Sequence, residues 1–224
     1  MDVKTLATIA GVTLESVIDC EAVKGGHVLR IDLKKEPALH RLIKARSTME
    51  AQLPDGDVFD VNCVLDGSPH AFTVESMDKY RTYGWVDGSD EGRVPAWRLR
   101  AQVYPPHSAY GASIEYIGLL VFDRHTGTVY DLSQPNDHMQ RPSMSYVLGY
   151  LSGADILKFI IGYANAGNLE VNHDFESENQ MRLTGAFADV RVNMPNCHEH
   201  LEQAPDREFV VQLPSGFYNL TGSL

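Results

Sequence analysis

Cysteine is scarce in this chain, and long hydrophobic runs are missing. The three cysteines, Cys20, Cys63 and Cys197, are odd in number and widely spaced, unlike the paired cysteines of a disulfide-stabilised secreted domain. No run of about 18 apolar residues is present, so no transmembrane helix is expected. An acid at Asp2 and a polar-interrupted apolar run after it are atypical of a secretory signal peptide. We therefore expect a cytoplasmic protein that binds no membrane.

The sequence also lacks the common motifs of enzymes. It contains no GxSxG nucleophile elbow, no GxxxxGK[ST] phosphate loop, no GxGxxG dinucleotide motif and no HxE…PCxxC deaminase pattern. The HExxH and paired CxxC patterns of zinc sites are absent as well. These absences favour a protein that is not an enzyme and uses no cofactor.

Basic residues are few and unevenly distributed. The formal net charge is −11, from 19 Lys and Arg against 30 Asp and Glu. Residues 1–110 hold 13 basic and 16 acidic side chains, and residues 111–224 hold 6 and 14, so the second half carries −8. An acidic surface repels nucleic acid and anionic membranes and attracts basic proteins, although it also serves solubility alone. We expect a protein partner with a basic surface and no nucleic acid.

Hydrophobic periodicity predicts a run of strands with helices before and after it. Strands are expected over residues 27–35, 58–74, 96–105 and 114–132, and within 180–195 and 207–220. Helices are expected over residues 3–22, 37–53, 75–85 and, with a break at 152–155, 145–164. This order predicts an α+β fold with a mainly antiparallel sheet and helices packed on one side. Residues 1–165 are expected to form the core domain, and residues 166–224 a C-terminal extension or a small acidic β subdomain.

The stretch GLLVFDRHTGTVYDL, residues 118–132, places a polar tip between two apolar runs. His125 beside Asp123 has the residue types of a base and the carboxylate that orients it. A hairpin corner needs the same residues for structure, because an Asp accepts backbone hydrogen bonds and Gly127 can adopt a positive φ. We interpret the tip as a turn.

Residues 5–18, TLATIAGVTLESVI, resemble the helix-turn-helix of LacI-type repressors, with Ala7 at the helix contact and Gly11 at the turn. The second helix of such a motif would bring Glu15 and Asp19, and no Lys or Arg, to the phosphates. We therefore expect an amphipathic helix that packs on the core or on a sister chain, without DNA binding.

Metal-ligand residue types gather in NCHEHLE, residues 196–202, and in NHDFE, residues 172–176. His198 and His200 are two positions apart, a spacing that shares a face only on a strand. A metal-dependent enzyme that uses His173, His198 and His200 is therefore an alternative, whereas a solvated polar loop is the preferred interpretation.

Three further stretches are FTVESMDKYRTYGW (72–85), YIGLLVFDRHTGTVYDL (116–132) and SMSYVLGYLSGADILKFIIGYA (143–164). Together, over residues 70–165, they resemble the SUKH superfamily of bacterial toxin-immunity proteins, in which an IG strand, a D-x-x-TG-x-VY hairpin and a closing helix recur. The resemblance implies a curved sheet without an active site. It also implies a stoichiometric inhibitor that covers the active surface of a cognate toxin, often a nuclease or deaminase.

The sequence thus predicts a non-enzymatic protein-binding inhibitor, most simply an immunity protein that neutralises a cognate toxin. A phage-encoded inhibitor of a bacterial defence system is an alternative that the sequence leaves open. Candidate partner-binding residues are aromatic side chains able to anchor an interface, and acids of the second half: Trp85, Trp97, Tyr104, Tyr110, Glu199 and Glu202.

Overall fold

A computed structural model of the chain describes residues 1–45, 56–85, 93–122, 127–134, 141–177, 180–199 and 201–223. The helices in these ranges are α1 (Val3–Ala10) and α2 (Pro37–Ala45), with short 3-10 helices η1 (Leu14–Ser16), η2 (Leu33–Lys35) and η4 (Ala109–Gly111). The strands are β1 (Val17–Val23), β2 (Gly26–Asp32), β3 (Val58–Leu65), β4 (Ser68–His70), β5 (Ser76–Trp85), β6 (Arg93–Val103), β7 (Ile114–Phe122), β8 (Thr128–Asp131), β9 (Ser143–Leu151), β10 (Ile156–Ser177), β11 (Gln180–Met194) and β12 (Phe209–Ser223). None of these helices is long and apolar enough to span a membrane.

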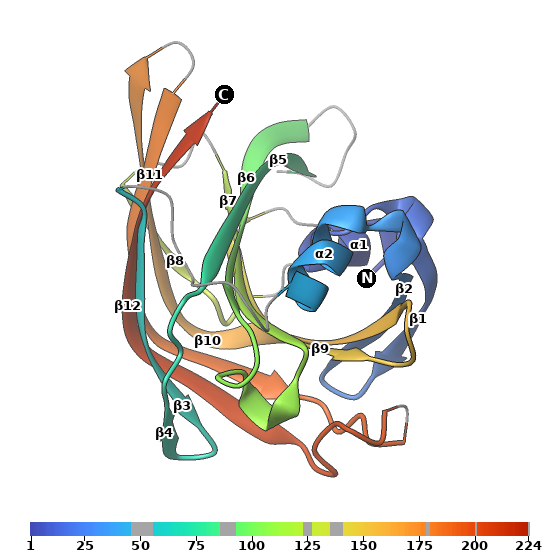
Figure 1. Ribbon diagram of the computed structural model, residues 1–224. Helices are drawn as coiled ribbons and strands as arrows, with labels where there is room; N and C mark the ends of the chain where they lie inside the picture. Colours follow the sequence, from blue (N-terminus) through green and yellow to red (C-terminus); the bar gives the residue numbers. More distant parts are fainter. Residues whose placement is uncertain are drawn as a thin grey trace.

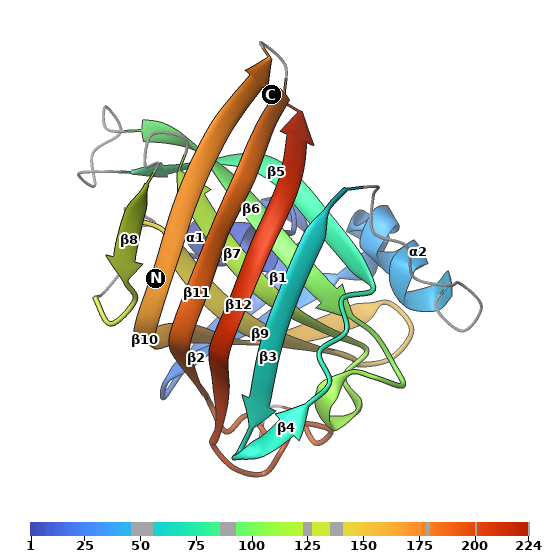
Figure 2. The ribbon, with the colours of Figure 1, turned by 90° about the vertical axis from the view of Figure 1, so that its left-hand side faces the viewer.

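The strands form two layers that share the long strand β10. The first half of β10 pairs with β2 and β9, and the second half pairs with β8 and β11, always antiparallel. Sheet A therefore runs β5-β6-β7-β9-β10-β2-β1, and sheet B runs β8-β10-β11-β12-β3-β4. Figure 1 shows sheet B on the left, sheet A in the centre and both helices on the right. Figure 2 looks onto the outer face of sheet B.

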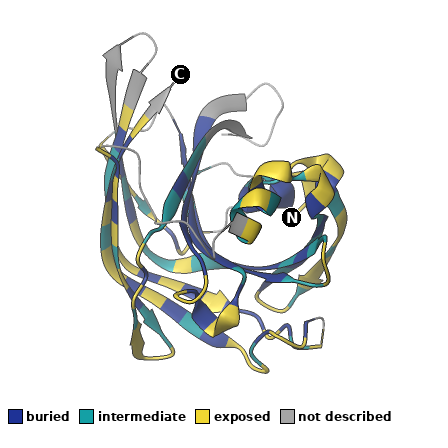
Figure 3. Cartoon of the chain, viewed as in Figure 1, coloured by how far each residue is buried: buried dark blue, intermediate teal, exposed yellow. Residues whose placement is uncertain are grey.

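Sheet A is covered on both faces. One apolar core lies between the sheets and includes Trp97, Tyr146 and Phe187. A second core lies between sheet A and the helices and includes Leu6 and Phe159. All nine residues of β7 are buried as a result, and the central sheet is almost uniformly dark in Figure 3.

The predicted α+β class is wrong, because most of the described chain is antiparallel sheet and only two α-helices are found in it. The helix predicted over residues 75–85 is strand β5, and the helices predicted over 145–164 are β9 and the start of β10. A strand that is buried on both faces does not alternate polar and apolar residues, so its sequence resembles that of a buried helix. Residues 37–45 of the helix predicted over 37–53 are α2, and the remainder lies largely outside the described residues.

The start of the chain is helical only as far as Ala10. The Asp2 carboxylate caps α1 by accepting a hydrogen bond from the Thr5 N–H at 2.8 Å, and Gly11 ends it at φ 65°. Residues 14–16 form a single 3-10 turn and β1 follows at once, where the repressor motif has its second helix.

The hairpin predicted over residues 114–132 has its strands in place but not their pairing. β7 pairs with β6 and β9, whereas β8 pairs with β10. Gly127 has φ 67°, as the turn interpretation expects, and its N–H donates to the Val171 carbonyl at 2.9 Å. Residues 123–126, including Asp123 and His125, lie outside the described residues.

The boundary predicted between residues 165 and 166 falls inside β10. The segment after it supplies the second half of β10, β11 and β12, and β12 pairs with β3 from the first half of the chain. Residues 166–224 therefore contribute most of sheet B (Figure 2).

Candidate functional site

Three connections meet at one end of the sandwich, at the bottom of Figure 1. They are the β3–β4 turn at residues 66–67, the β6–β7 connection at 104–113 and the β11–β12 connection at 195–208, and we call this surface the loop end. The Arg207 guanidinium lies 2.7 Å from the Asp66 carboxylate and so joins the first connection to the third.

Tyr110 is the exposed aromatic residue of the loop end, with 37% of its surface accessible. Its backbone is left-handed, at φ 50° and ψ 29°, a conformation that costs energy in a residue other than glycine. The ring packs 4.9 Å from the ring of Phe209, centroid to centroid. Partial burial and then the nearby Asp66 carboxylate raise the pKa of Tyr110. The side chain is therefore held at the surface by its neighbours.

Carboxylates dominate the connection at 195–208. Four exposed acids share this segment with one arginine: Glu199, Glu202, Asp206 and Glu208, with Arg207. The segment is fixed beneath by buried Cys197, Leu201 and Ala204, and the His198 ring bonds the Ala204 carbonyl at 3.1 Å. The loop end thus exposes carboxylates on a segment whose backbone is held by buried side chains.

Three of the predicted partner-binding residues, Tyr110, Glu199 and Glu202, are exposed on connections of this one surface. Trp97, in β6, is only 2% exposed and belongs to the core between the sheets. Tyr104 is fully buried, and its hydroxyl bonds the Gln102 side chain at 2.5 Å. Trp85 ends β5, and its side chain is outside the described residues. Neither Trp97 nor Tyr104 therefore offers surface to a partner.

The predicted metal candidates are not brought together by the described part of the structure. His198 bonds a backbone carbonyl, the side chain of His173 in β10 is not described, and His200 lies outside the described residues. Within the described ranges, no group of three or more His, Cys, Asp and Glu side chains is arranged to hold a metal ion.

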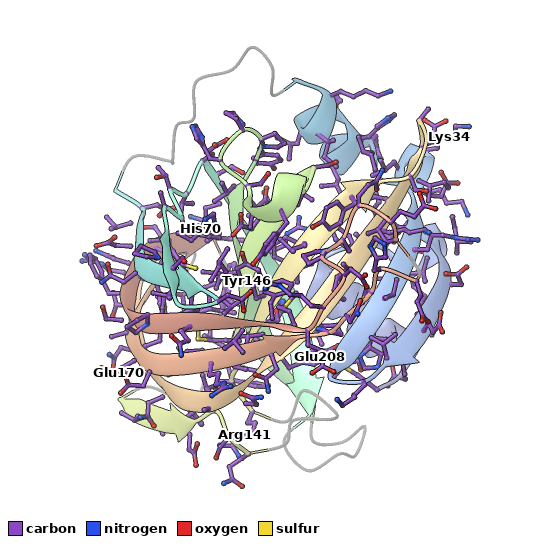
Figure 4. The ribbon with its side chains drawn as sticks, turned by 90° about the horizontal axis from the view of Figure 1, so that it is seen from below. Lys34, His70, Arg141, Tyr146, Glu170 and Glu208 are labelled. Carbon is purple, nitrogen blue, oxygen red and sulfur yellow. The ribbon has the colours of Figure 1, made fainter. Side chains whose placement is uncertain are left out.

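A fully buried carboxylate, Glu115 in β7, lies beneath the loop end. Its oxygens are 2.9 and 3.2 Å from Nε2 of His70, 2.5 Å from the N–H of Ala109, and within a short hydrogen bond of the Tyr146 hydroxyl. The Ala109 N–H and the Tyr146 hydroxyl donate to these oxygens, and His70 Nε2 donates in the tautomer that carries a proton on this nitrogen. Two of these partners, His70 from β4 and Tyr146 from β9, are labelled in Figure 4.

The same centre contains the residue types of a cysteine nucleophile. Cys63 stands directly opposite His70 in the β3–β4 ladder, so the two side chains point to one face, and Glu115 orients the imidazole. Burial and then the Glu115 charge raise the pKa of Cys63 to about 12. The thiol therefore stays protonated at neutral pH, and this geometry gives no activated nucleophile.

The role that the contacts do show for Glu115 is to hold a turn. Its bond to the Ala109 N–H fixes the residue next to Tyr110, so the buried carboxylate sets the position of the exposed ring. Neither Glu115 nor His70 was among the residues predicted from the sequence. A signal for Glu115 was present, because it is the single charged residue in SIEYIGLLVF, residues 113–122.

Thiol labelling tests the burial of Cys63 and Cys197, whose pKa values burial raises to about 12. At pH 8 about one thiol in ten thousand is then ionised, against roughly a quarter in an unfolded chain. We expect iodoacetamide to label both residues about 1000-fold more slowly in the folded than in the urea-unfolded protein, as measured by peptide mass spectrometry. Equal labelling rates in the two states would contradict the buried positions.

Comparisons with known proteins give no relative from which a function could be transferred. A scan against protein-family models, a search of curated proteins and a search of solved structures each found no match.

Proposed function

We propose that the protein is a cytoplasmic, non-enzymatic inhibitor that binds a basic surface of another protein through its loop end. The observation that carries the proposal is Tyr110, an exposed aromatic ring held in a left-handed backbone conformation beside a connection with four exposed carboxylates. A toxin of a competing cell and a component of a bacterial defence system are both partners of this kind.

The anchoring of Tyr110 favours binding because the side chain loses little conformational entropy when a partner binds. Aromatic side chains at protein interfaces contribute a large share of the binding energy when they enter a pocket on the partner. Ordering a free side chain costs roughly 0.5–1.5 kcal/mol on association, and a side chain that is already fixed avoids most of that cost. Tyr110 is fixed by Phe209, and its neighbour Ala109 is fixed by Glu115.

The acidic connection favours recognition of a basic partner. Complementary charge accelerates encounter and rejects wrong partners, and its effect falls with ionic strength. Glu199, Glu202 and Asp206 are exposed, and Arg207, the cation of this connection, is joined to Asp66. A partner that binds the loop end therefore contacts the exposed carboxylates of Glu199, Glu202 and Asp206.

Charge reversal tests this surface. The native partner is first isolated from host extract on the immobilised protein, purified, and assayed for inhibition at equimolar protein. We expect Glu199→Lys with Glu202→Lys to weaken its binding roughly 10- to 100-fold at low salt, with a smaller loss at high salt. The measurement is the dissociation constant by calorimetry at two ionic strengths.

The matched control reverses two acids on the outer face of sheet B, Asp60 in β3 and Glu170 in β10. In Figure 4 Glu170 lies at the left edge, apart from Glu208 of the β11–β12 connection. Asp60→Lys with Glu170→Lys changes the net charge equally and is expected to alter binding less than threefold. Equal losses from both pairs would mean that only net charge matters, and the proposed site would be wrong.

A further inference from the structure

Strand β1 lies at one edge of sheet A, opposite the edge formed by β5. It pairs with β2 and forms no other ladder within the described ranges. In an antiparallel ladder, residues alternate between those whose backbone groups face the neighbouring strand and those whose groups face away. About half of the amides and carbonyls of an edge strand are therefore directed outward, where they can pair with another chain.

We propose that β1 accepts a basic extended segment of the partner as an additional strand of sheet A. This inference rests on the proposed function, because it names how the partner bound at the loop end would extend onto the adjacent edge of sheet A. Strand addition of this kind takes affinity from backbone hydrogen bonds and specificity from alternate side chains.

The side chains of β1 suit such a segment. Ile18 is 43% exposed, and Asp19, Glu21 and Ala22 are exposed as well. From Thr5 to Val23 the chain holds three acids and no Lys or Arg. Asp19 already pairs with Arg30 of β2 at 3.0 Å, on the inner side of the strand. Opposite charges on adjacent strands stabilise pairing, so lysines or arginines on the added strand are favoured beside the carboxylates of β1.

The edge strand is continuous with the loop end. Lys24, in the β1–β2 turn, bonds Glu208 of the acidic connection at 2.9 Å, and Figure 4 shows Glu208 between that connection and the hairpin. Glu21 is close enough to Cys197 for its charge to add to the burial that raises the pKa of that thiol. One partner could therefore contact the loop end and β1 together.

A second copy of this chain is a poorer occupant of the edge. Antiparallel pairing of β1 with β1 of a copy, centred on Cys20, would bring Asp19 opposite the carboxylate of Glu21 of the copy, and like charges opposite one another destabilise a ladder. A basic strand has the opposite relation to the same carboxylates. Charge complementarity thus selects the partner segment over self-association.

A pair of synthetic peptides tests the inference directly. The probe is an eight-residue peptide of alternating lysine and threonine, and its control carries N-methyl groups on every backbone amide, which keep the charge but remove the ladder donors on both edges. We expect the probe, at millimolar concentration, to slow hydrogen exchange of outward-facing β1 amides at least tenfold, as measured by NMR, and the control to have no such effect. Equal protection by both peptides, protection elsewhere only, or none at all would overturn strand addition.

Variants separate this inference from the proposed function. Ala22→Pro removes one amide of the exposed edge, and Glu21→Lys removes a favourable charge in case the proline disturbs folding; urea unfolding checks both. We expect each variant to bind the native partner with an affinity at least tenfold lower than the wild-type protein, and Asp60→Lys serves as the control. If they bind it normally while the Glu199→Lys, Glu202→Lys protein does not, the proposed function stands and strand addition is wrong. Self-association of the wild-type chain through β1 would also overturn the chosen occupant.

Discussion

Replacing Glu115 with alanine is expected to destabilise the folded protein by about 3–5 kcal/mol, the cost of removing one member of a buried, hydrogen-bonded pair. The carboxylate is fully buried and accepts from His70, Tyr146 and the Ala109 N–H. Alanine leaves all three donors without this acceptor inside the sandwich, and each lost partner is costly away from water. Stability is measured as the free energy of unfolding in urea.

Two further variants give this measurement its controls. Glu115→Gln keeps one acceptor oxygen for these donors, so a smaller loss of about 1–2 kcal/mol is expected. Glu170→Ala removes a half-buried carboxylate of the outer face of sheet B and is expected to cost less than about 1 kcal/mol. A loss below 1 kcal/mol for Glu115→Ala would mean that water or a rearranged neighbour replaces the carboxylate.

The Glu115 variants also connect the buried centre to binding. If the carboxylate sets the Tyr110 turn through Ala109, Glu115→Gln should weaken partner binding while most of the protein remains folded. A purely structural Glu115 would change stability and leave the affinity of the folded fraction unchanged. The two quantities are therefore measured on the same preparation.

Strands whose apolar residues alternate with polar ones, and residues with local signals, were predictable from the sequence. The alternation of Trp97, Leu99, Ala101 and Val103 marks β6, in which all four side chains are buried. Asp2 and Gly11 bound α1 by capping, which requires only neighbouring residues. Such signals are readable because the physical cause lies within a few positions of the residue.

The central strands were not predictable in the same way. Val147 and Leu148 are adjacent in β9 and are both fully buried, one in each core, because sheet A is covered on both sides. The sequence of such a strand shows no period, and the choice between helix and strand is then made by its neighbours in space. The separation of β7 from β8 has the same origin. β7 forms its ladder with β9 and β8 forms its ladder with β10, so the two strands of the predicted hairpin do not pair with each other.

The residues of the candidate site also fall into those that the sequence indicates locally and those that only the topology brings together. Acidic residues 199, 202 and 206 and the aromatic Tyr110 are recognisable as surface types from composition. His70 and Glu115 are 45 positions apart, and they meet only because β4 ends and β7 begins at the same side of the sandwich. Contacts at that separation follow from topology, and the topology had been mistaken.

Replacing Arg100 with methionine is expected to be the second most damaging change, with a loss of about 2–4 kcal/mol. Its guanidinium donates to the Ala10 and Gly11 carbonyls at 3.0 and 3.2 Å, at the C-terminal end of α1, and pairs with Asp78 at 2.5 Å. Methionine fills the same space but satisfies none of these acceptors, two of which are helix-end carbonyls without a partner in the helix. Asp78 is about one-third exposed, so solvent lessens the loss of the ion pair.

Lysine at the same position separates charge from shape. Arg100→Lys keeps the cation near the negative end of the α1 dipole, but a single ammonium lacks the fork that reaches a carboxylate and two carbonyls at once. We therefore expect lysine to recover only part of the free energy of unfolding that methionine loses. Full recovery would show that charge alone holds α1 on sheet A, and no recovery would show that the fork is indispensable. Hydrogen exchange of the α1 amides distinguishes local release of the helix from global unfolding, because release exposes α1 while the strands of sheet B stay protected.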